Sequence, residues 1–272
     1  MPIAYAARET ETIKNLHEIS LPVIGACGHE KTVSVRLADT DDQRNSACML
    51  INKMYSWRGY GSDHHVPVRA THSTFTALVD NDVIGTLTLG VDSAAGLAAD
   101  GIFREEIDQF RRIPGAQVCE LTKLAFNSEM PSKPMLAALF HIVFIYGQRR
   151  HSCTDLFIEV NPRHRRFYES MLGFKRVGAI KTNTSVDAPA QLMWLKIEDI
   201  RLQIDEHAGL GDAAGVRSLY PFFFSQREEL GIYARLADRD QHTPARERND
   251  VCSGRIPRDL RTILPGESEA LQ

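Results

Sequence analysis

One strand-like segment, residues 154–160, most limits what this chain can fold into. It is apolar on both faces of an extended chain, through Leu156, Phe157, Ile158 and Val160. A strand of this kind must be covered on both sides, which is typical of a central parallel strand in an α/β sheet. The apolar run before it, residues 134–146, is shorter than the about 20 residues of a membrane span. We therefore expect a buried helix over about 132–150 and no transmembrane segment.

The rest of the pattern extends this sheet. Alternating apolar residues predict further strands at 32–37, 74–79, 83–91, 116–126, 174–180 and 191–197. Apolar residues at helical spacing predict helices after the N-cap candidates at 39–42, over 97–112 and over 163–172, where Gly173 ends the last one. Asn81 and Asp82 predict a short hairpin turn. The order is β-α-β-β-α-β-α-β-α-β-β, which predicts an α/β fold with antiparallel and parallel parts.

Composition excludes several classes of protein. The chain has 272 residues, of which 43% are hydrophobic and 25% charged, which is ordinary for a globular protein. Its net charge of −3 provides no global basic field for nucleic acid. Five widely spaced cysteines without a CxxC pair favour reduced thiols, and the first residues carry no secretory signal. These observations predict a cytoplasmic protein.

The domain organisation follows from changes in pattern along the chain. We expect a weakly structured leader at 1–30, an α/β domain at 31–199 and a C-terminal helical extension at 200–240, with helices at 200–207 and 215–236. Residues 241–272 are polar and contain Pro244, Pro257 and Pro265, which predicts a flexible tail.

Residues 160–174, Val-Asn-Pro-Arg-His-Arg-Arg-Phe-Tyr-Glu-Ser-Met-Leu-Gly-Phe, resemble the late signature of the GNAT acyltransferase superfamily. The resemblance covers about residues 32–197 and implies a GNAT-like mixed central sheet flanked by helices. In ordinary members, a glycine-containing turn between the fourth strand and its helix lets backbone N–H groups hold the pyrophosphate of coenzyme A. This chain has no glycine between Gly115 and Gly147, and Pro131 and Pro134 lack N–H groups.

Two further segments narrow the family. Residues 119–124, Cys-Glu-Leu-Thr-Lys-Leu, resemble the Glu-Leu-Ser-Arg segment of acyl-homoserine-lactone synthases, although Lys123 and Thr88 stand where those enzymes have arginines. Residues 54–60, Met-Tyr-Ser-Trp-Arg-Gly-Tyr, resemble the FeeM-like N-acyl amino acid synthases, of the long-chain N-acyltyrosine type. Both groups take a fatty acyl chain from acyl carrier protein.

The resemblance implies an N-acyltransferase that moves a medium or long acyl chain from acyl carrier protein to the α-amine of an amino acid. It implies an acyl-phosphopantetheine thioester as co-substrate and no metal or redox cofactor. The alternatives are an acyl-homoserine-lactone synthase, an acyl-CoA-dependent N-acyltransferase, or a non-catalytic GNAT-fold protein that binds an acyl ligand.

Two residues are candidates for the chemistry. Amide formation from a thioester needs a neutral amine and a proton for the leaving thiolate. Glu120 is the candidate base, directly or through a water, and its alternative is a structural carboxylate paired with Lys123 or an arginine. Tyr168 matches the aromatic position that donates to the leaving sulfur, and its alternative is a core aromatic.

Binding roles follow from the same resemblance. Thr122, Lys123, Leu124 and Asn161 are expected at the donor, with helix capping as the alternative role of Asn161. Trp57 and Arg58 are expected at the acceptor, where Arg58 pairs with the carboxylate. Adjacent His64 and His65 with Asp63 lack a third ligand at motif spacing, so no metal site is predicted.

A basic surface and an apolar stripe complete the expectations. The expected docking surface for acyl carrier protein consists of Arg149, Arg150, Arg163, Arg165 and Arg166, with a solvated helix face as the alternative. The apolar stripe is expected to be mostly core, with an acyl tunnel as the alternative role of part of it, and consists of Leu136, Leu139, Phe140, Val143 and Phe144.

Overall fold

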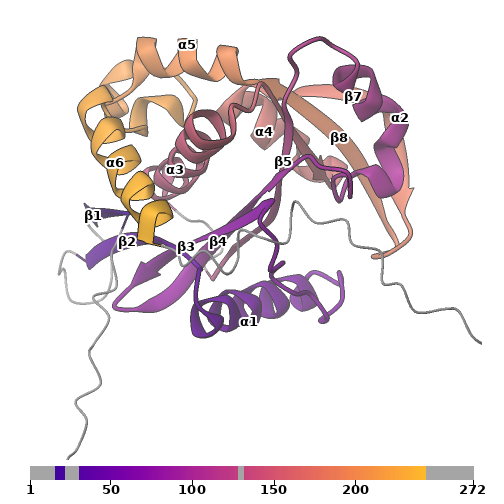
Figure 1. Cartoon of the computed structure of the whole chain (residues 1–272), viewed down its shortest axis with the longest axis horizontal. Coiled ribbons are helices and arrows are strands. Elements are labelled where there is room, and N and C mark those ends of the chain that lie inside the picture. Colours follow the sequence, from indigo (N-terminus) through magenta and orange to yellow (C-terminus); the bar gives the residue numbers. More distant parts are fainter. Residues whose placement is uncertain (1–15, 22–30, 128–131, 243–272) are drawn as a thin grey trace, which may run out of the picture.

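The computed structural model describes residues 16–21, 31–127 and 132–242. In these residues an eight-stranded sheet has the order β1-β2-β3-β4-β5-β6-β8-β7 (Figure 1). Only β5 and β6 pair in parallel, and the other neighbours are antiparallel. The strands are β1 (His17–Leu21), β2 (Lys31–Leu37), β3 (His72–Val79), β4 (Asp82–Val91), β5 (Val118–Phe126), β6 (Asp155–Val160), β7 (Lys175–Asn183) and β8 (Ala188–Lys196). The expected mixed α/β sheet is confirmed.

Helices cover both faces of the sheet. The helices α1 (Asp41–Trp57) and α2 (Asp100–Arg111) pack on one face, and α3 (Lys133–His151) packs on the other (Figure 1). Alternation along the strands explains this division, because Cys119 and Leu121 of β5 face α3 while Val118 faces α2. On β6, Phe157 faces α2 and its neighbours face α3, so this strand is covered on both sides, as its apolar sequence predicts.

Local signals fix several element ends. Thr40 and Gln43 form a capping box at the start of α1. Asp80 and Asn81 both have positive φ angles, 51° and 68°, and form the tight β3–β4 turn one residue earlier than predicted. Gly173, with a φ of 82°, ends α4 (Arg165–Leu172), which follows the short helix η1 (Pro162–His164).

The parallel pair β5–β6 separates partway along its length. Its ladder runs from Val118↔Asp155 to Leu121↔Ile158 and then stops. Just beyond, the β4–β5 register shifts, Lys123 adopts a φ of 55°, and its carbonyl accepts a hydrogen bond from Thr86 Oγ1 at 2.7 Å. The bulge turns β5 away from β6 and opens the sheet at this point.

Both ends of the chain depart from the expected organisation. Residues 17–21 lie in the predicted leader but form β1, which pairs with β2. In the C-terminal extension, α5 (Ile197–His207) is followed by η2 (Gly211–Ala214), η3 (Tyr220–Phe222) and α6 (Gln226–His242). The second predicted helix is therefore wrong over 215–225, because Pro221 disfavours a helix before it and Ser225 with Glu228 caps α6. The tail after residue 242 lies outside the described residues.

A buried carboxylate fastens α6 to the core. Glu229 is 1% exposed and accepts hydrogen bonds from Arg149 of α3 and Arg201 of α5 at 2.9–3.1 Å. His141 of α3 lies 3.6 Å away from it. Burial alone raises the pKa of Glu229, but these partners outweigh burial and lower it to about 2. One carboxylate thus joins three helices.

None of the helices in the described part combines the length and apolar character needed to cross a bilayer.

Replacing Glu229 should destabilise the fold. The substitution Glu229→Gln leaves two partly buried arginines without a counter-charge, so we expect a loss of about 2 kcal/mol in the free energy of unfolding. Because the folded-state pKa lies below the usual value of 4.5, the stabilisation is complete above that pH and disappears as the pH falls towards 2. Urea unfolding of both proteins at several pH values measures this difference. The exposed Glu206→Gln on α5 is the control, and an equal effect of the two substitutions would contradict the prediction.

Candidate active site

A cleft of about 520 Å³ lies where β5 and β6 separate. Its walls come from the C-terminal end of α1, the first turns of α3, η1 and α4, and the β7–β8 hairpin. The polar and charged side chains along it are Tyr55, Arg58, Tyr60, His64, Thr122, Lys123, Glu159, Asn161, His164, Tyr168 and Asn183.

The expected donor residues all lie on this cleft. Thr122, Lys123 and Leu124 line it from the bulged part of β5. Burial lowers the pKa of Lys123. Asn161 lines the cleft and also caps η1, because its Oδ1 accepts a hydrogen bond from Arg163 N at 3.2 Å. Thr88, where the lactone synthases carry an arginine, is instead fully buried and shares a hydrogen bond with Thr74 at 2.8 Å.

Tyr168 also lines the cleft, from α4. Its ring packs edge-on against Phe167 and Phe174. Burial raises the pKa of its phenol, so the group stays protonated at neutral pH. Its hydroxyl makes no hydrogen bond to another described residue, which leaves a proton donor facing the cleft.

Glu120, the expected base, does not line the cleft. It is 2% exposed, and its two oxygens accept hydrogen bonds from Ala98 N at 2.6 Å and Ala99 N at 3.1 Å. Burial raises its pKa to about 6, although these hydrogen bonds oppose the increase. A Cβ at Gly90 would lie only 3.2 Å from Glu120 Cγ, so the glycine leaves room for this side chain. The contacts of Glu120 are those of a carboxylate that holds the loop before α2.

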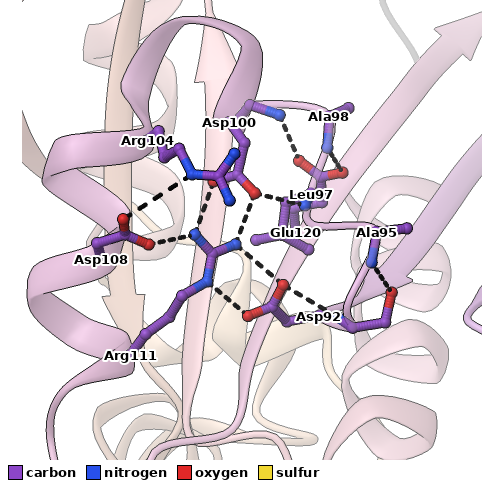
Figure 2. Close-up of polar contacts among 11 residues, drawn as sticks. Asp92, Ala95, Leu97, Ala98, Asp100, Arg104, Asp108, Arg111 and Glu120 are labelled. Atoms are coloured by element: carbon purple, nitrogen blue, oxygen red, sulfur yellow. Dashed lines mark hydrogen bonds and ion pairs between the residues drawn. The ribbon is translucent and has the colours of Figure 1, made fainter.

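Arg111 stabilises the loop before α2. Its guanidinium binds Asp92, Asp100 and Asp108 at 2.6–2.9 Å (Figure 2). Asp100 in turn accepts a hydrogen bond from Leu97 N, next to the two amides that bind Glu120 (Figure 2). Burial raises the pKa of Asp100, but Arg111 and the Leu97 amide outweigh burial and lower it.

Glu159 of β6 lines the cleft and was not among the predicted site residues. Its Oε1 accepts a hydrogen bond from Asn183 Nδ2 at 2.6 Å. Burial raises its pKa above the usual range, and the hydrogen bond from Asn183 opposes this increase. Alternation along 154–160 predicts that Glu159 and Ile158 point to opposite faces of the sheet. Only the β5–β6 register shows that Glu159 lies beyond the last residue pair of these two strands.

The two expected acceptor residues have different surroundings. Arg58 lines the cleft and donates to Met54 O at 3.1 Å, whereas Trp57 is 73% exposed and does not line it. Tyr55, Tyr60 and His64 line the cleft as well, and the His64 ring lies edge-on to Tyr55.

The adjacent histidines His64 and His65, which follow α1, also have different surroundings. His65 pairs with Asp63 at the surface, while His64 faces the cleft. Among the residues that the structure describes, no three His, Cys, Asp or Glu side chains are grouped to hold a metal ion.

The expected basic surface divides into two parts. Arg163, Arg165 and Arg166 belong to η1 and α4 beside the cleft, where Arg163 donates to Tyr60 Oη at 3.0 Å and Arg165 to Pro162 O. Arg149 and Arg150 lie near the other end of α3, about 20 Å along the helix from its first turns. Since Arg149 also binds Glu229, these two do not extend the surface at the cleft.

Loss of Arg111 should loosen the loop that holds Glu120. In Arg111→Met three carboxylates face one another without a cation, and we expect a loss of about 2–3 kcal/mol of stability. Hydrogen exchange of the Ala98 and Ala99 amides should accelerate more than that of β5. Arg104→Met removes the same charge from an exposed site on α2 and is the control. Equal hydrogen-exchange rates of these two amides in both variants would contradict the role of Arg111 in holding the loop.

Comparisons with known proteins identify the family of this chain. A family model described as "N-acyl amino acid synthase FeeM" matches residues 46–196. Among solved structures, FeeM, an N-acyl amino acid synthase from uncultured soil microbes, is 27% identical with a TM-score of 0.58, over 63% of this chain and 94% of that one. The AHL synthase LasI is 13% identical with a TM-score of 0.47, over 61% and 90%. No curated protein matches significantly. Because the family model spans more than half of its residues, the chain belongs to the FeeM family of N-acyl amino acid synthases and is a GNAT-type N-acyltransferase.

Proposed function

We propose that this enzyme transfers a fatty acyl chain from acyl carrier protein to the α-amine of an amino acid. The observation that carries the proposal is that one cleft, at the place where β5 and β6 separate, is lined both by apolar side chains of α3, called the apolar wall below, and by the charged side chains Arg58, Lys123 and Glu159. A thioester with a long acyl tail needs the apolar lining, and an amino acid needs the charged groups.

The apolar wall fits the acyl tail. Leu136 and Phe140 of α3 line the cleft, whereas Leu139 from the same stripe is fully buried. A second cavity, of about 30 Å³, shares Phe140 and Leu121 with the cleft and is lined almost entirely by apolar atoms. Val143 and Phe144 line this cavity, together with Tyr220 and Phe223 of the C-terminal extension. The acyl chain would run from the cleft towards it.

The start of α3 supports a carrier-bound donor. Pro134 occupies its first turn, so one backbone N–H that would hold a pyrophosphate is missing. Acyl carrier protein presents the same pantetheine arm without a nucleotide. Its acidic surface would meet the arginines of η1 and α4 at the rim of the cleft.

Cys48, Cys119 and Cys153 are free thiols, in keeping with action in the reducing cytoplasm.

In the proposed reaction the thioester carbonyl lies against β5 beyond Leu121, where its backbone no longer pairs with β6. The amine nitrogen attacks the carbonyl carbon, the C–N bond forms and the C–S bond breaks. The leaving sulfur takes a proton from the Tyr168 hydroxyl, which recovers one from the former amine. Thioester and amino acid supply all the atoms of the amide product.

Mass spectrometry tests the proposed function directly. The full chain is incubated with palmitoyl-acyl carrier protein and a mixture of the common amino acids, and we expect an N-palmitoyl amino acid. A lactone product would make the enzyme a lactone synthase instead. Product only from palmitoyl-CoA would assign it to acyl-CoA donors, and no product from either donor would refute catalysis of this transfer.

The effects of salt and of a charge reversal test whether acyl carrier protein docks beside the cleft. We expect kcat/KM for palmitoyl-acyl carrier protein to exceed that for palmitoyl-CoA and to fall with salt, because the Debye length shrinks from about 10 Å at 0.1 M to about 3 Å at 1 M. An exposed ion pair contributes about 0.2–1 kcal/mol, so Arg166→Glu should lower kcat/KM about 1.4- to 5-fold. A short pantetheine thioester should be used unchanged, and the exposed Arg104→Glu on α2 should have no effect. Equal use of both donors, insensitive to salt and to Arg166→Glu, would argue against carrier docking here.

A further inference from the structure

Two carboxylates lie on the same face of the sheet near the proposed reaction centre, and their surroundings differ. Glu120 of β5 stands opposite Phe157 of β6, one row before the ladder ends. Glu159 is two residues after Phe157 on β6, so it lies on the same face but beyond the last strand pair. Glu159 therefore stands at the opening, and Glu120 stands behind it.

Their hydrogen bonds also differ. Both oxygens of Glu120 are occupied by the Ala98 and Ala99 amides, and the side chain is almost fully buried. Glu159 is half-buried, and its Oε1 accepts the bond from Asn183. Its Oε2 has no hydrogen-bond partner among the described residues. Glu159 thus keeps a free oxygen on the cleft, as a base that receives a substrate proton must.

Charges along the cleft favour the same residue. Among the described lining residues Glu159 is the only carboxylate, while Arg58 and Lys123 are cations. A free amino acid carries one ammonium and one carboxylate group. The cleft therefore offers one negative site for the ammonium and positive sites for the carboxylate.

We propose that Glu159, rather than Glu120, binds the ammonium group of the acceptor and removes its proton before attack. This assignment rests on the proposed function. Glu159 takes one proton from the ammonium, and the freed lone pair attacks the thioester carbon. After the C–S bond breaks and Tyr168 has protonated the sulfur, Glu159 releases its proton to solvent. The net products are the amide, the thiol and one proton.

Asn183 is the positioning residue for Glu159. Its Oδ1 accepts a hydrogen bond from Ser185 N at 2.9 Å, which fixes the amide so that Nδ2 points at Glu159. Asn183 ends β7 and lies beside Ala188 and Pro189 of the hairpin that lines the cleft. The hairpin therefore holds the carboxylate at the opening.

Several titratable groups share the environment of Glu159, and any pH profile includes them. Glu120 is on the neighbouring strand β5, and the other groups line the same cleft: Tyr55, Arg58, Tyr60, His64, Lys123, His164 and Tyr168. The test therefore compares variants that change one group at a time.

The decisive experiment measures kcat and KM for the amino acid identified by mass spectrometry, in wild type, Glu159→Gln and Glu120→Gln. At pH 7 we expect Glu159→Gln to lower kcat/KM about 10²- to 10⁴-fold, the usual cost of losing a general base, and Glu120→Gln to lower it much less. The deficit of Glu159→Gln should shrink about tenfold per pH unit as the amine loses its proton without help. A merely structural role would give a deficit that does not shrink with pH.

Two further variants keep the test interpretable. Glu159→Asp retains the carboxylate and should recover part of the activity. Asn183→Asp removes a donor and places a second carboxylate beside Glu159, which raises the pKa of Glu159 and should move the rising limb of the pH–rate profile to higher pH. Circular dichroism melts show whether each variant is folded.

The outcomes separate the two proposals. An active wild type with a near-normal Glu159→Gln and a disabled Glu120→Gln overturns the role of Glu159 and leaves the proposed function intact. If the folded Glu159→Gln shows a deficit that is constant with pH, and Glu159→Asp restores nothing, the role is also overturned. No amide from the wild-type chain with any donor overturns the proposed function and this role together.

Discussion

The early end of the hydrogen-bond ladder between β5 and β6 is the constraint on which the active site depends. Up to Leu121 and Ile158 the two strands satisfy each other's backbone groups. Beyond that pair, backbone groups and side chains of both strands face an opening instead of each other. The bulge at Lys123, held by the Thr86 hydroxyl, keeps the strands apart. The first turns of α3, the aromatic face of α4 and the β7–β8 hairpin all converge on this opening.

Much of the fold could be predicted because its signals are local. The strand at β6 is apolar on both faces, Thr40 and Gln43 mark the start of α1, and Gly173 is needed where α4 ends with a positive φ. Each signal acts within a few residues, so it is readable without knowledge of distant contacts. The place of Thr122 to Leu124 on the cleft was predictable for a related reason, since these residues form one continuous family segment.

The parts that could not be predicted depend on long-range pairing. Whether Glu120 or Glu159 reaches the cleft depends on the register of two strands that are more than 30 residues apart in sequence. Arg149 reads as a surface cation until Glu229, 80 residues later, is placed against it. The strand at β1 is short, and its pairing with β2, whose first residue lies ten positions further along the chain, decides whether it joins the sheet. Composition and periodicity carry no information about such pairings.

The segment matched by the family model ends at residue 196, but the core does not end there. Ile197, Ile200, Tyr220 and Phe223 close the small cavity behind the cleft, and α6 is fixed to α3 by its buried carboxylate. An expression boundary set at the end of the matched segment would leave this apolar wall in contact with water. Such a fragment would be prone to aggregation although it retains every family motif. A fragment of this enzyme that is to be expressed alone or fused to another protein should therefore extend at least through α6.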